Sequence, residues 1–370
     1  MVSCTSDQPD RADAEDASES SFPVPVIEYQ PRHYICYRAS AKPVIDGRLT
    51  EGDWQKAEWT ESFVDIEGES KPLPRFKTQV KMLWDEDYFY IGAEMEEPHL
   101  WGTLTERDAV IYHDNDFEVF IDPDGDSHEY YELEINALGT EWDLLLIRPY
   151  RDGAPAVNAW DITGLKTAVA MHGTLNDPGD VDSGWNVEIA IPWKTLAECA
   201  HRSSPPEDND VWWVNFSRVQ WQLEIQNGSY VKMKDSSGEK SLPENNWVWS
   251  PQGLIAMHYP EMWGLVQFSQ TMVGGKQKAF APPEDLEARW AMRRLYYAQR
   301  DYQDRTGKYT SSLNDLELGP KEIMLERYSW PPSLQATPYT FDAFLNSIDG
   351  RKRLSINTEG RLQSFSTTGK

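Results

Sequence analysis

Apolar and polar residues alternate with a period of two along most of the chain, from Thr78 to Phe268. Successive side chains of a β-strand point to opposite faces, so this spacing predicts half-buried strands and not helices. Residues 78–95 alternate, turn at Asp85 to Asp87 and alternate again, which predicts a hairpin. Six later segments have the same spacing and are separated by loops rich in Pro, Gly, Asn and Asp: FEVFI, YYELEIN, WDLLLI, GWNVEIAI, VWWVNFSRV and WGLVQFS.

Many short strands at such intervals are typical of a β-sandwich or barrel. The sequence therefore predicts an all-β fold with an antiparallel β-sandwich over residues 33–270. We expect one short helix after Pro192, in WKTLAECA, and an irregular loop over residues 226–246.

The pattern changes after residue 270. Pro282 and Pro283 precede three acidic residues, which indicates the start of a helix, and Gly307 indicates its end. The apolar residues of this segment occupy two faces, so we predict that the helix packs between the sandwich and a final hairpin formed by RLSIN and RLQSF. Its arginines are expected to face solvent. Residues 271–370 thus form a small C-terminal α+β appendage.

The formal net charge of −26 argues against nucleic acid as a partner, because a polyanion releases no phosphate counterions on binding. Residues 276–370 differ from the rest, with 15 Lys and Arg against 12 Asp and Glu, which supports two modules. Their positive charge also suggests docking on the acidic sandwich. No run approaches the roughly 18 apolar residues of a membrane-spanning helix.

Residues 1–32 are expected to form a disordered acidic tether. One interpretation is a lipoprotein N-terminus with Cys4 as the lipidated residue, which places the protein outside the cytoplasm, at the cell surface or in the periplasm. The other is a frayed cytoplasmic tail with an incidental cysteine. Cys36 and Cys199 lie far apart and outside any CxxC motif, so neither zinc nor a disulfide framework is indicated.

Nine carboxylates lie within residues 114–136. Within the strands they alternate with apolar residues, so Glu118, Glu132 and Glu134 project from the face opposite the core. The turn between the strands carries closely spaced oxygen donors suited to calcium, although an ordinary acidic turn is the alternative. The calcium candidates are Asp122, Asp124 and Asp126 first, and Asp114 and Asp116 second.

Seven segments occur in an order that resembles carbohydrate-binding module family 9-like proteins, over roughly residues 42–269. The resemblance implies a β-sandwich, calcium held in loops and a sugar held between aromatic rings. The segments are AKPVIDGRLTEGDWQKAEW, FKTQVKMLWDEDYFYIGAEM, ERDAVIYHDNDFEVFIDPDGD, NALGTEWDL, GWNVEIAIPWKTL, VNFSRVQW and PEMWGLVQF.

The resemblance assigns one sugar-stacking ring to Tyr112 and a hydroxyl-binding carboxylate to Glu118. This sequence departs from the family pattern at Met257, where a second aromatic residue is expected, and at Glu134, where an arginine is expected. Aromatic residues in or beside loops are further candidates for stacking on a sugar ring. The remaining carbohydrate-binding candidates are His113, Trp142, Trp160 and Trp249.

The expected function is non-catalytic binding of a poly- or oligosaccharide, with glycan-degrading enzymes as partners. A glycoside hydrolase, or an accessory subunit of one, is a first alternative, because such chemistry needs only two suitably spaced carboxylates. A haem-binding redox module is a second alternative, with Met257 and His258 as the suggestive pair. The sequence contains no G-x-S-x-G, P-loop or G-x-G-x-x-G motif.

Overall fold

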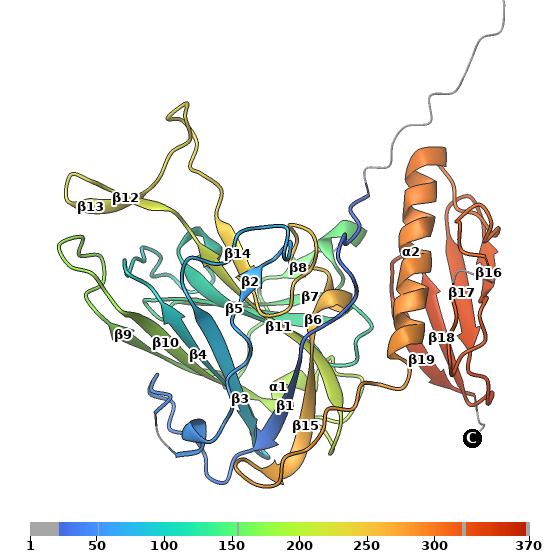
Figure 1. Cartoon of the computed structure of the whole chain (residues 1–370), viewed down its shortest axis with the longest axis horizontal. Helices are drawn as coiled ribbons and strands as arrows, with labels where there is room; N and C mark the ends of the chain where they lie inside the picture. The colour runs from blue at the N-terminus through green and yellow to red at the C-terminus, as the bar shows by residue number, and fades with distance from the viewer. Residues whose placement is uncertain (1–21, 51, 154, 320–322, 368–370) are drawn as a thin grey trace, which may run out of the picture.

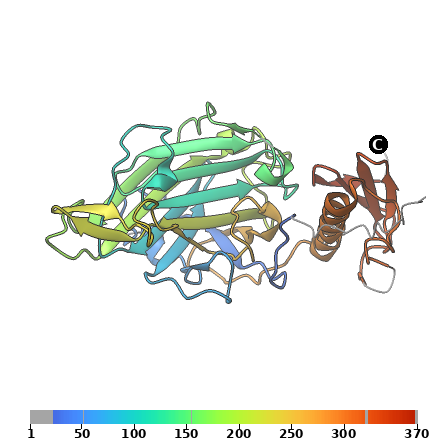
Figure 2. The same ribbon diagram turned by 90° about the horizontal axis from the view of Figure 1, so that it is seen from above.

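The computed structural model describes residues 22–367 apart from 51, 154 and 320–322. A large β-sandwich is joined to a smaller unit made of one long helix and a sheet (Figure 1). Figure 2 shows the sandwich from above, with its two layers facing each other and the C-terminal unit at one end. The predicted fold class is therefore confirmed.

One continuous sheet of 13 strands forms the sandwich, in the order β8-β7-β6-β5-β11-β15-β1-β3-β4-β10-β9, with β14 bridging β11 and β2. The predicted hairpins and the short helix α1 (Trp193–Leu196) are present. The strands are β1 (His33–Arg38), β2 (Val64–Asp65), β3 (Thr78–Trp84), β4 (Tyr88–Glu96), β5 (Asp116–Asp122), β6 (Tyr130–Asn136), β7 (Glu141–Leu146), β8 (Ala156–Val157), β9 (Lys166–His172), β10 (Gly184–Pro192), β11 (Val211–Gln220), β14 (Asn245–Val248) and β15 (Gly264–Met272).

The sheet folds over so that its two halves share one core. Ile91 of β4, Val119 of β5 and Leu133 of β6 belong to the same buried cluster. Two features differ from the sequence prediction. First, β1 runs parallel to both β15 and β3. Second, the region predicted to be an irregular loop, residues 226–246, begins at the last residue of β12 (Leu223–Gln226), contains β13 (Ser229–Lys232), which pairs with β12, and ends within β14, which pairs with β11.

The C-terminal unit consists of α2 (Leu286–Thr306) packed on a four-stranded antiparallel sheet. Gly307 ends α2 as predicted, in the left-handed conformation (φ 75°) that favours glycine. The predicted final hairpin is present as the last two strands, and two unpredicted strands extend it. The sheet contains β16 (Ser333–Ala336), β17 (Phe341–Asn346), β18 (Lys352–Asn357) and β19 (Leu362–Ser366).

The expectation that the arginines of α2 face solvent holds for Arg294 and Arg305 but is wrong for Arg293 and Arg289. Arg293 is 2% exposed, and it donates hydrogen bonds to the Gly360 carbonyl and to Ser127 Oγ, both at 2.8 Å. Arg289 donates to the Gly125 carbonyl at 3.2 Å. Because Ser127 and Gly125 lie in the turn between β5 and β6, these arginines dock the C-terminal unit onto the sandwich.

The tether prediction needs correction for its last residues. Residues 1–21, which include Cys4, lie outside the described part of the chain. Within 22–32, the Val26 N–H donates to the Gly253 carbonyl at 3.2 Å, and the Tyr29 ring stacks on Trp290 of α2 at 4.3 Å. This stretch therefore packs on both units. A search of the described residues finds no helix with the length and apolar character needed to cross a membrane.

Candidate functional site

A row of three side chains crosses the face of β5, β6 and β7 opposite the core. In the register of the antiparallel strands, Glu118 of β5 lies opposite Glu134 of β6, and Glu134 lies opposite Trp142 of β7. The alternation of these strands places the acids on this face, as predicted. Both acids are nevertheless buried, at 6% and 2% exposed. The face is therefore a covered floor and not a solvated surface.

Carboxyl groups converge on this floor. Single oxygens of Asp116, Glu118 and Glu134 all lie within 4.8 Å of one another. Burial raises the pKa of Glu118 to about 7, although Ser217 donates a hydrogen bond that opposes the rise. Burial, followed by the charges of neighbouring carboxylates, raises the pKa values of Asp116, Glu132 and Glu134 well above their usual range. Burial therefore favours the neutral form of these carboxyl groups, and the floor becomes fully ionised only when a positive charge compensates it.

The floor has acceptor oxygens to spare. The Val219 N–H donates to Asp116 Oδ1 at 3.2 Å, and the Tyr112 N–H donates to Glu134 Oε2 at 2.9 Å. Asp116 Oδ2 and Glu132 Oε2 are buried and have no hydrogen-bond partner among the described residues. Buried acceptors normally have partners, so these two oxygens indicate a missing ligand.

Tyr112 stands at the edge of this floor with 38% of its surface exposed. It lies in the short 3-10 helix Ile111–His113, and its carbonyl accepts a hydrogen bond from Trp221 Nε1 at 2.8 Å. His113 is exposed beside it, with ring centroids 4.8 Å apart. Tyr112 therefore borders the floor with His113 beside it, and the contact of both residues with a sugar remains a prediction.

A second exposed tyrosine was missed by the sequence analysis. Tyr150 lies in the segment after β7, is 49% exposed, and packs edge-on against the His258 ring at 4.4 Å. Burial, followed by the charges of Glu132 and Glu134, raises its pKa to about 12, and the Tyr112 hydroxyl also contributes. Tyr150 therefore borders the same floor as Tyr112, a proximity that no local sequence pattern reveals.

The three tryptophan candidates have different locations. Trp142 lies on the floor beside Glu134, and its buried Nε1 has no hydrogen-bond partner. The assignments of Trp160 and Trp249 to the site are wrong. Trp160 packs against Tyr131 on the core side, with its Nε1 bonded to Glu198. Trp249 is fully buried in the core, because the segment after β14 turns its ring inward against Phe216.

Asp114 does not join the carboxylates of the floor, so its pairing with Asp116 as metal ligands is wrong. Its two oxygens accept hydrogen bonds from the Thr103 N–H and hydroxyl, the Leu104 N–H and Asn136 Nδ2, at 2.7 to 3.0 Å. These four donors satisfy the carboxylate, which therefore anchors the loop of residues 103–104.

The turn acids Asp122, Asp124 and Asp126 also converge within 4.8 Å. Local donors use most of their oxygens: the Gly125 and Ser127 N–H groups bond the two oxygens of Asp122, both at 2.9 Å. Gly125 adopts φ 69°, and a Cβ there would meet the Trp213 ring at 2.5 Å. Arg361 occupies Asp126 Oδ2, so the donor set fits a cation only in part. Calcium at this turn remains a prediction.

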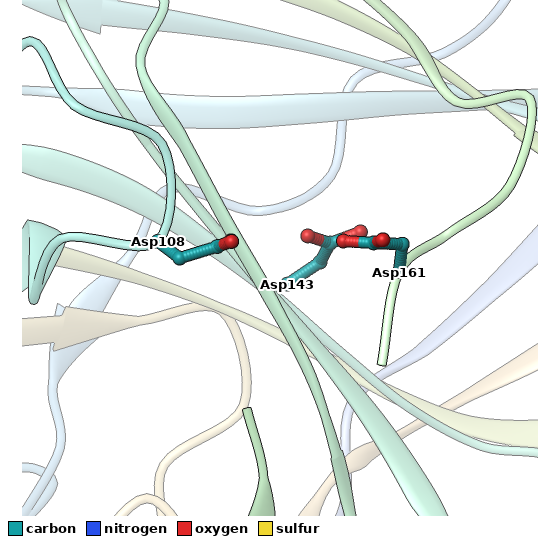
Figure 3. A group of neighbouring side chains, drawn as sticks. All are labelled: Asp108, Asp143 and Asp161. Carbon is teal, nitrogen blue, oxygen red and sulfur yellow. The ribbon is translucent and has the colours of Figure 1, made fainter. Parts of the chain in front are cut away.

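Asp108, Asp143 and Asp161 form a third acidic group, and their carboxylates face one another in Figure 3. Arg107 already supplies a cation to it. The guanidinium forms ion pairs with all three residues, through a short contact to Asp143, a 3.4 Å contact to Asp161 and a 3.7 Å contact to Asp108. Arg107 thus replaces any need for a metal here.

The geometry around Met257 and His258 favours packing over haem ligation. His258 Nδ1 lies 2.9 Å from the Tyr130 hydroxyl, and the imidazole is surrounded by the rings of Tyr130, Phe120 and Tyr150. Met257 is partly buried and its sulfur accepts a contact from Gln252 at 3.7 Å.

Residues 45–208 match the family described as carbohydrate family 9 binding domain-like, which confirms the family resemblance over that segment. The matched segment contains Tyr112, Tyr150 and the β5–β6–β7 floor.

Exoglucanase XynX of Acetivibrio thermocellus is 25% identical over 154 residues, and endo-1,4-beta-xylanase A of Thermotoga maritima is 28% identical over 154 residues. Each alignment covers 42% of this chain, and the chain spans only 12% of the length of either relative. A family 9 carbohydrate-binding module from Caldicellulosiruptor kristjanssonii, in complex with glucose, is 16% identical with a TM-score of 0.42, covering 67% of this chain and 100% of that chain.

Proposed function

We propose that this chain binds β-1,4-linked gluco- or xylo-oligosaccharide segments, without cleaving them, at the floor bordered by Tyr112 and Tyr150. The single observation that carries the proposal is the pair of exposed tyrosine rings beside a floor of buried carboxylates. The family match over residues 45–208 and the names of the xylanase and exoglucanase relatives support it.

The chemistry of the floor suits a sugar. Flat aromatic faces stack on the apolar face of a pyranose ring, while carboxylates accept hydrogen bonds from its hydroxyls. Asp116 Oδ2 and Glu132 Oε2 are acceptors without partners, and Trp142 Nε1 is a donor without one. Hydrogen bonds from a bound sugar would satisfy all three atoms.

Isothermal titration calorimetry with cellotriose and xylotriose tests the proposal. Stacking is worth about 0.5 to 1.5 kcal/mol, so Tyr112→Ala and Tyr150→Ala are each expected to weaken binding roughly two- to twelvefold. Tyr339→Ala is the matched control, since Tyr339 is 83% exposed and lies in the turn between β16 and β17 of the C-terminal unit. Loss of binding in the control, or none in the two site variants, would refute the assignment.

Hydrolysis is the second candidate, favoured by the raised pKa of Glu118 beside other carboxylates. Incubation with the same oligosaccharides and measurement of reducing ends separates the two functions. We expect no release above that of a Glu118→Gln variant. Release by the wild-type chain alone would convert the proposal from binding to catalysis.

The proposal includes a location outside the cytoplasm, alongside glycan-degrading enzymes. Fractionation of cells that produce the protein, with Cys4→Ser as the comparison, tests the lipid anchor. An anchored protein is expected to move from the membrane fraction to the soluble extracytoplasmic fraction when Cys4 is replaced. Recovery in the cytoplasm would contradict the proposed location.

A further inference from the structure

The buried carboxyl groups of the floor lack a counter-charge. Asp116, Glu118, Glu132 and Glu134 are each at most 6% exposed. In the described part of the chain no lysine, arginine or histidine forms a salt bridge with any of them, and the charged groups reported around them are other carboxylates. A buried carboxylate without a counter-charge is strongly unfavourable, so these groups either retain protons or bind a cation.

The other two acidic groups have a cation in place. Arg107 pairs with Asp108, Asp143 and Asp161, and Arg361 lies 2.7 Å from Asp126 in the turn. The floor is therefore the one acidic group, among the described residues that could hold a metal, without an arginine. The difference indicates that its counter-ion comes from solution.

The geometry points to a divalent cation. Calcium binds oxygen ligands at about 2.3 to 2.6 Å, so ligands on opposite sides of the ion are about 4.6 to 5.2 Å apart. One oxygen each from Asp116, Glu118 and Glu134 lies within 4.8 Å of the other two, so a single ion could contact all three. All three donors are hard carboxylate oxygens, which favour calcium over zinc.

Glu132 gives an independent indication of a missing ligand. Its side chain neighbours Glu134 and feels the charge of Glu118, yet Glu132 Oε2 is buried without a partner. Two neighbouring carboxylates repel each other unless a shared proton or a cation lies between them, and a proton shared by Glu132 and Glu134 leaves Glu132 Oε2 without a partner. Asp116 Oδ2, also buried and unpartnered, completes the set of available oxygens.

We propose that Asp116, Glu118 and Glu134 bind a calcium-class divalent cation, with Glu132 as the adjacent fourth carboxylate, and that open coordination positions accept a pair of neighbouring sugar hydroxyls. Calcium commonly takes six to eight oxygen ligands, so the three acids leave positions free. The cation site stands on its own geometry, whereas hydroxyl coordination rests on the proposed function.

Calorimetric titration of the chelator-treated full chain with CaCl₂, in the absence of glycan, tests the cation site. Glu134→Gln and Glu118→Gln keep the side-chain shape and remove one charge each, and we expect each to weaken binding at least tenfold. Asp124→Asn tests the turn as the alternative site, and Asp161→Asn, in the group that pairs with Arg107, is the matched control and should bind like wild type. Thermal melts without calcium verify that every variant is folded.

Two results would overturn the cation site. One is the absence of calcium binding by the wild-type chain. The other is loss of binding in Asp124→Asn with wild-type affinity in both glutamine variants, which places the ion in the turn.

Cellotriose and xylotriose titrations with calcium and with EDTA then test hydroxyl coordination. We expect EDTA to weaken sugar binding at least tenfold in the wild-type chain. Equal affinity in both buffers would refute hydroxyl coordination and leave the proposed function intact. No sugar binding in either buffer would refute the proposed function, while the calcium titration without glycan still decides the cation site.

Discussion

Arg361 Nε lies 2.7 Å from Asp126 Oδ2 although the two residues are 235 positions apart in the sequence. The adjacent Leu362 N–H donates to the Asp126 carbonyl at 3.1 Å. The acidic turn between β5 and β6 is therefore a docking surface for the C-terminal unit. This contact accounts for part of the dense negative charge of residues 114–136, and the carboxylate floor accounts for another part.

Replacing Arg293 is expected to destabilise the whole chain. Its guanidinium is 2% exposed, lies 3.6 Å from Glu261 and bonds the sandwich and the C-terminal sheet at once. Arg293→Met should lower the free energy of unfolding by about 3 kcal/mol, because it leaves the buried Glu261 without the positive charge of the Arg293 guanidinium. Urea unfolding measures the change.

Arg305→Gln is the control for that substitution. Arg305 lies on the same helix and pairs with Asp301, but both side chains are partly exposed, so the loss should stay below about 0.5 kcal/mol. Similar losses in the two variants would show that Arg293 contributes no more than a surface residue.

Acid is expected to weaken the fold through two buried groups. Burial, followed by the charge of Arg151, lowers the pKa of His258 to about 3, so between about pH 6.5 and 3 the unfolded chain binds one more proton. For Glu261, burial raises the pKa but Arg151 and Arg293 outweigh it and hold it at about 2. Stability contributed by Glu261 is therefore lost below about pH 4.5.

Each additional proton bound by the unfolded chain makes the free energy of unfolding fall by about 1.4 kcal/mol for every pH unit of acidification. We expect urea unfolding between pH 7 and 4.5 to show that the free energy of unfolding falls less steeply with acidification in His258→Gln than in the wild-type chain. Below pH 6 the two slopes should differ by roughly 1.4 kcal/mol per pH unit. His172→Gln, which replaces an exposed imidazole, serves as the control. Parallel curves for wild type and His258→Gln would contradict the assigned shift.

Sugar affinity is expected to depend on helix α2, which lies outside the floor. Tyr296 and Arg300 of α2 both donate to Asp152 Oδ1 at 2.5 Å, and Arg300 also donates to the Arg151 carbonyl at 3.3 Å. These bonds hold the segment that carries Tyr150. Arg300→Gln and Tyr296→Phe should therefore weaken binding two- to fivefold, up to the value of one stacked ring.

Calorimetry with cellotriose or xylotriose measures this coupling, with Arg305→Gln again as the helix control. A Tyr150→Ala background provides the decisive comparison, since Arg300→Gln should have no further effect once the ring is absent. Full additivity of the two substitutions would show that α2 does not act through Tyr150.

The corrected position of Trp249 has a direct consequence for stability. Its ring is fully buried against Phe216, so Trp249→Ala should cost about 3 to 5 kcal/mol of unfolding free energy. Trp142→Ala, which removes a half-buried ring of the floor, should cost less and should alter sugar binding instead. Thermal melts and calorimetry on both variants distinguish the roles, and a stable Trp249→Ala chain with impaired sugar binding would restore the original assignment.

Local patterns predicted the strands and the helix because burial alternates with a fixed period. Val119 and Leu133 are buried as their spacing requires, and Gly307 ends α2 where the sequence indicates. The same spacing placed Glu118 and Glu134 on the correct face. The spacing gave no information on the burial of that face, because burial depends on residues outside β5, β6 and β7, such as Tyr112 and Tyr150.

Contacts between distant segments explain the remaining errors. Arg293 has no sequence neighbour that indicates burial, because its partners Ser127 and Gly360 are set by docking. Tyr150 is held beside the floor by packing on His258 and by the contacts of Asp152 with α2. Trp249 follows β14, whose pairing with β11 turns the ring inward, and an isolated tryptophan near a loop carries no information about that turn.

The parallel placement of β1 constrains the order in which the sandwich assembles. His33 of β1 pairs in register with Leu265 of β15, and β15 also pairs with β11, so β15 joins the two halves of the sheet. A chain emerging from the ribosome exposes the unpaired edges of β1 and β11 until Gly264–Met272 has been made. Closure of the sheet is thus a late event that depends on contacts between distant segments. Nascent chains that stop before β15 expose unpaired backbone N–H and C=O groups on two strand edges, where other proteins can pair with them.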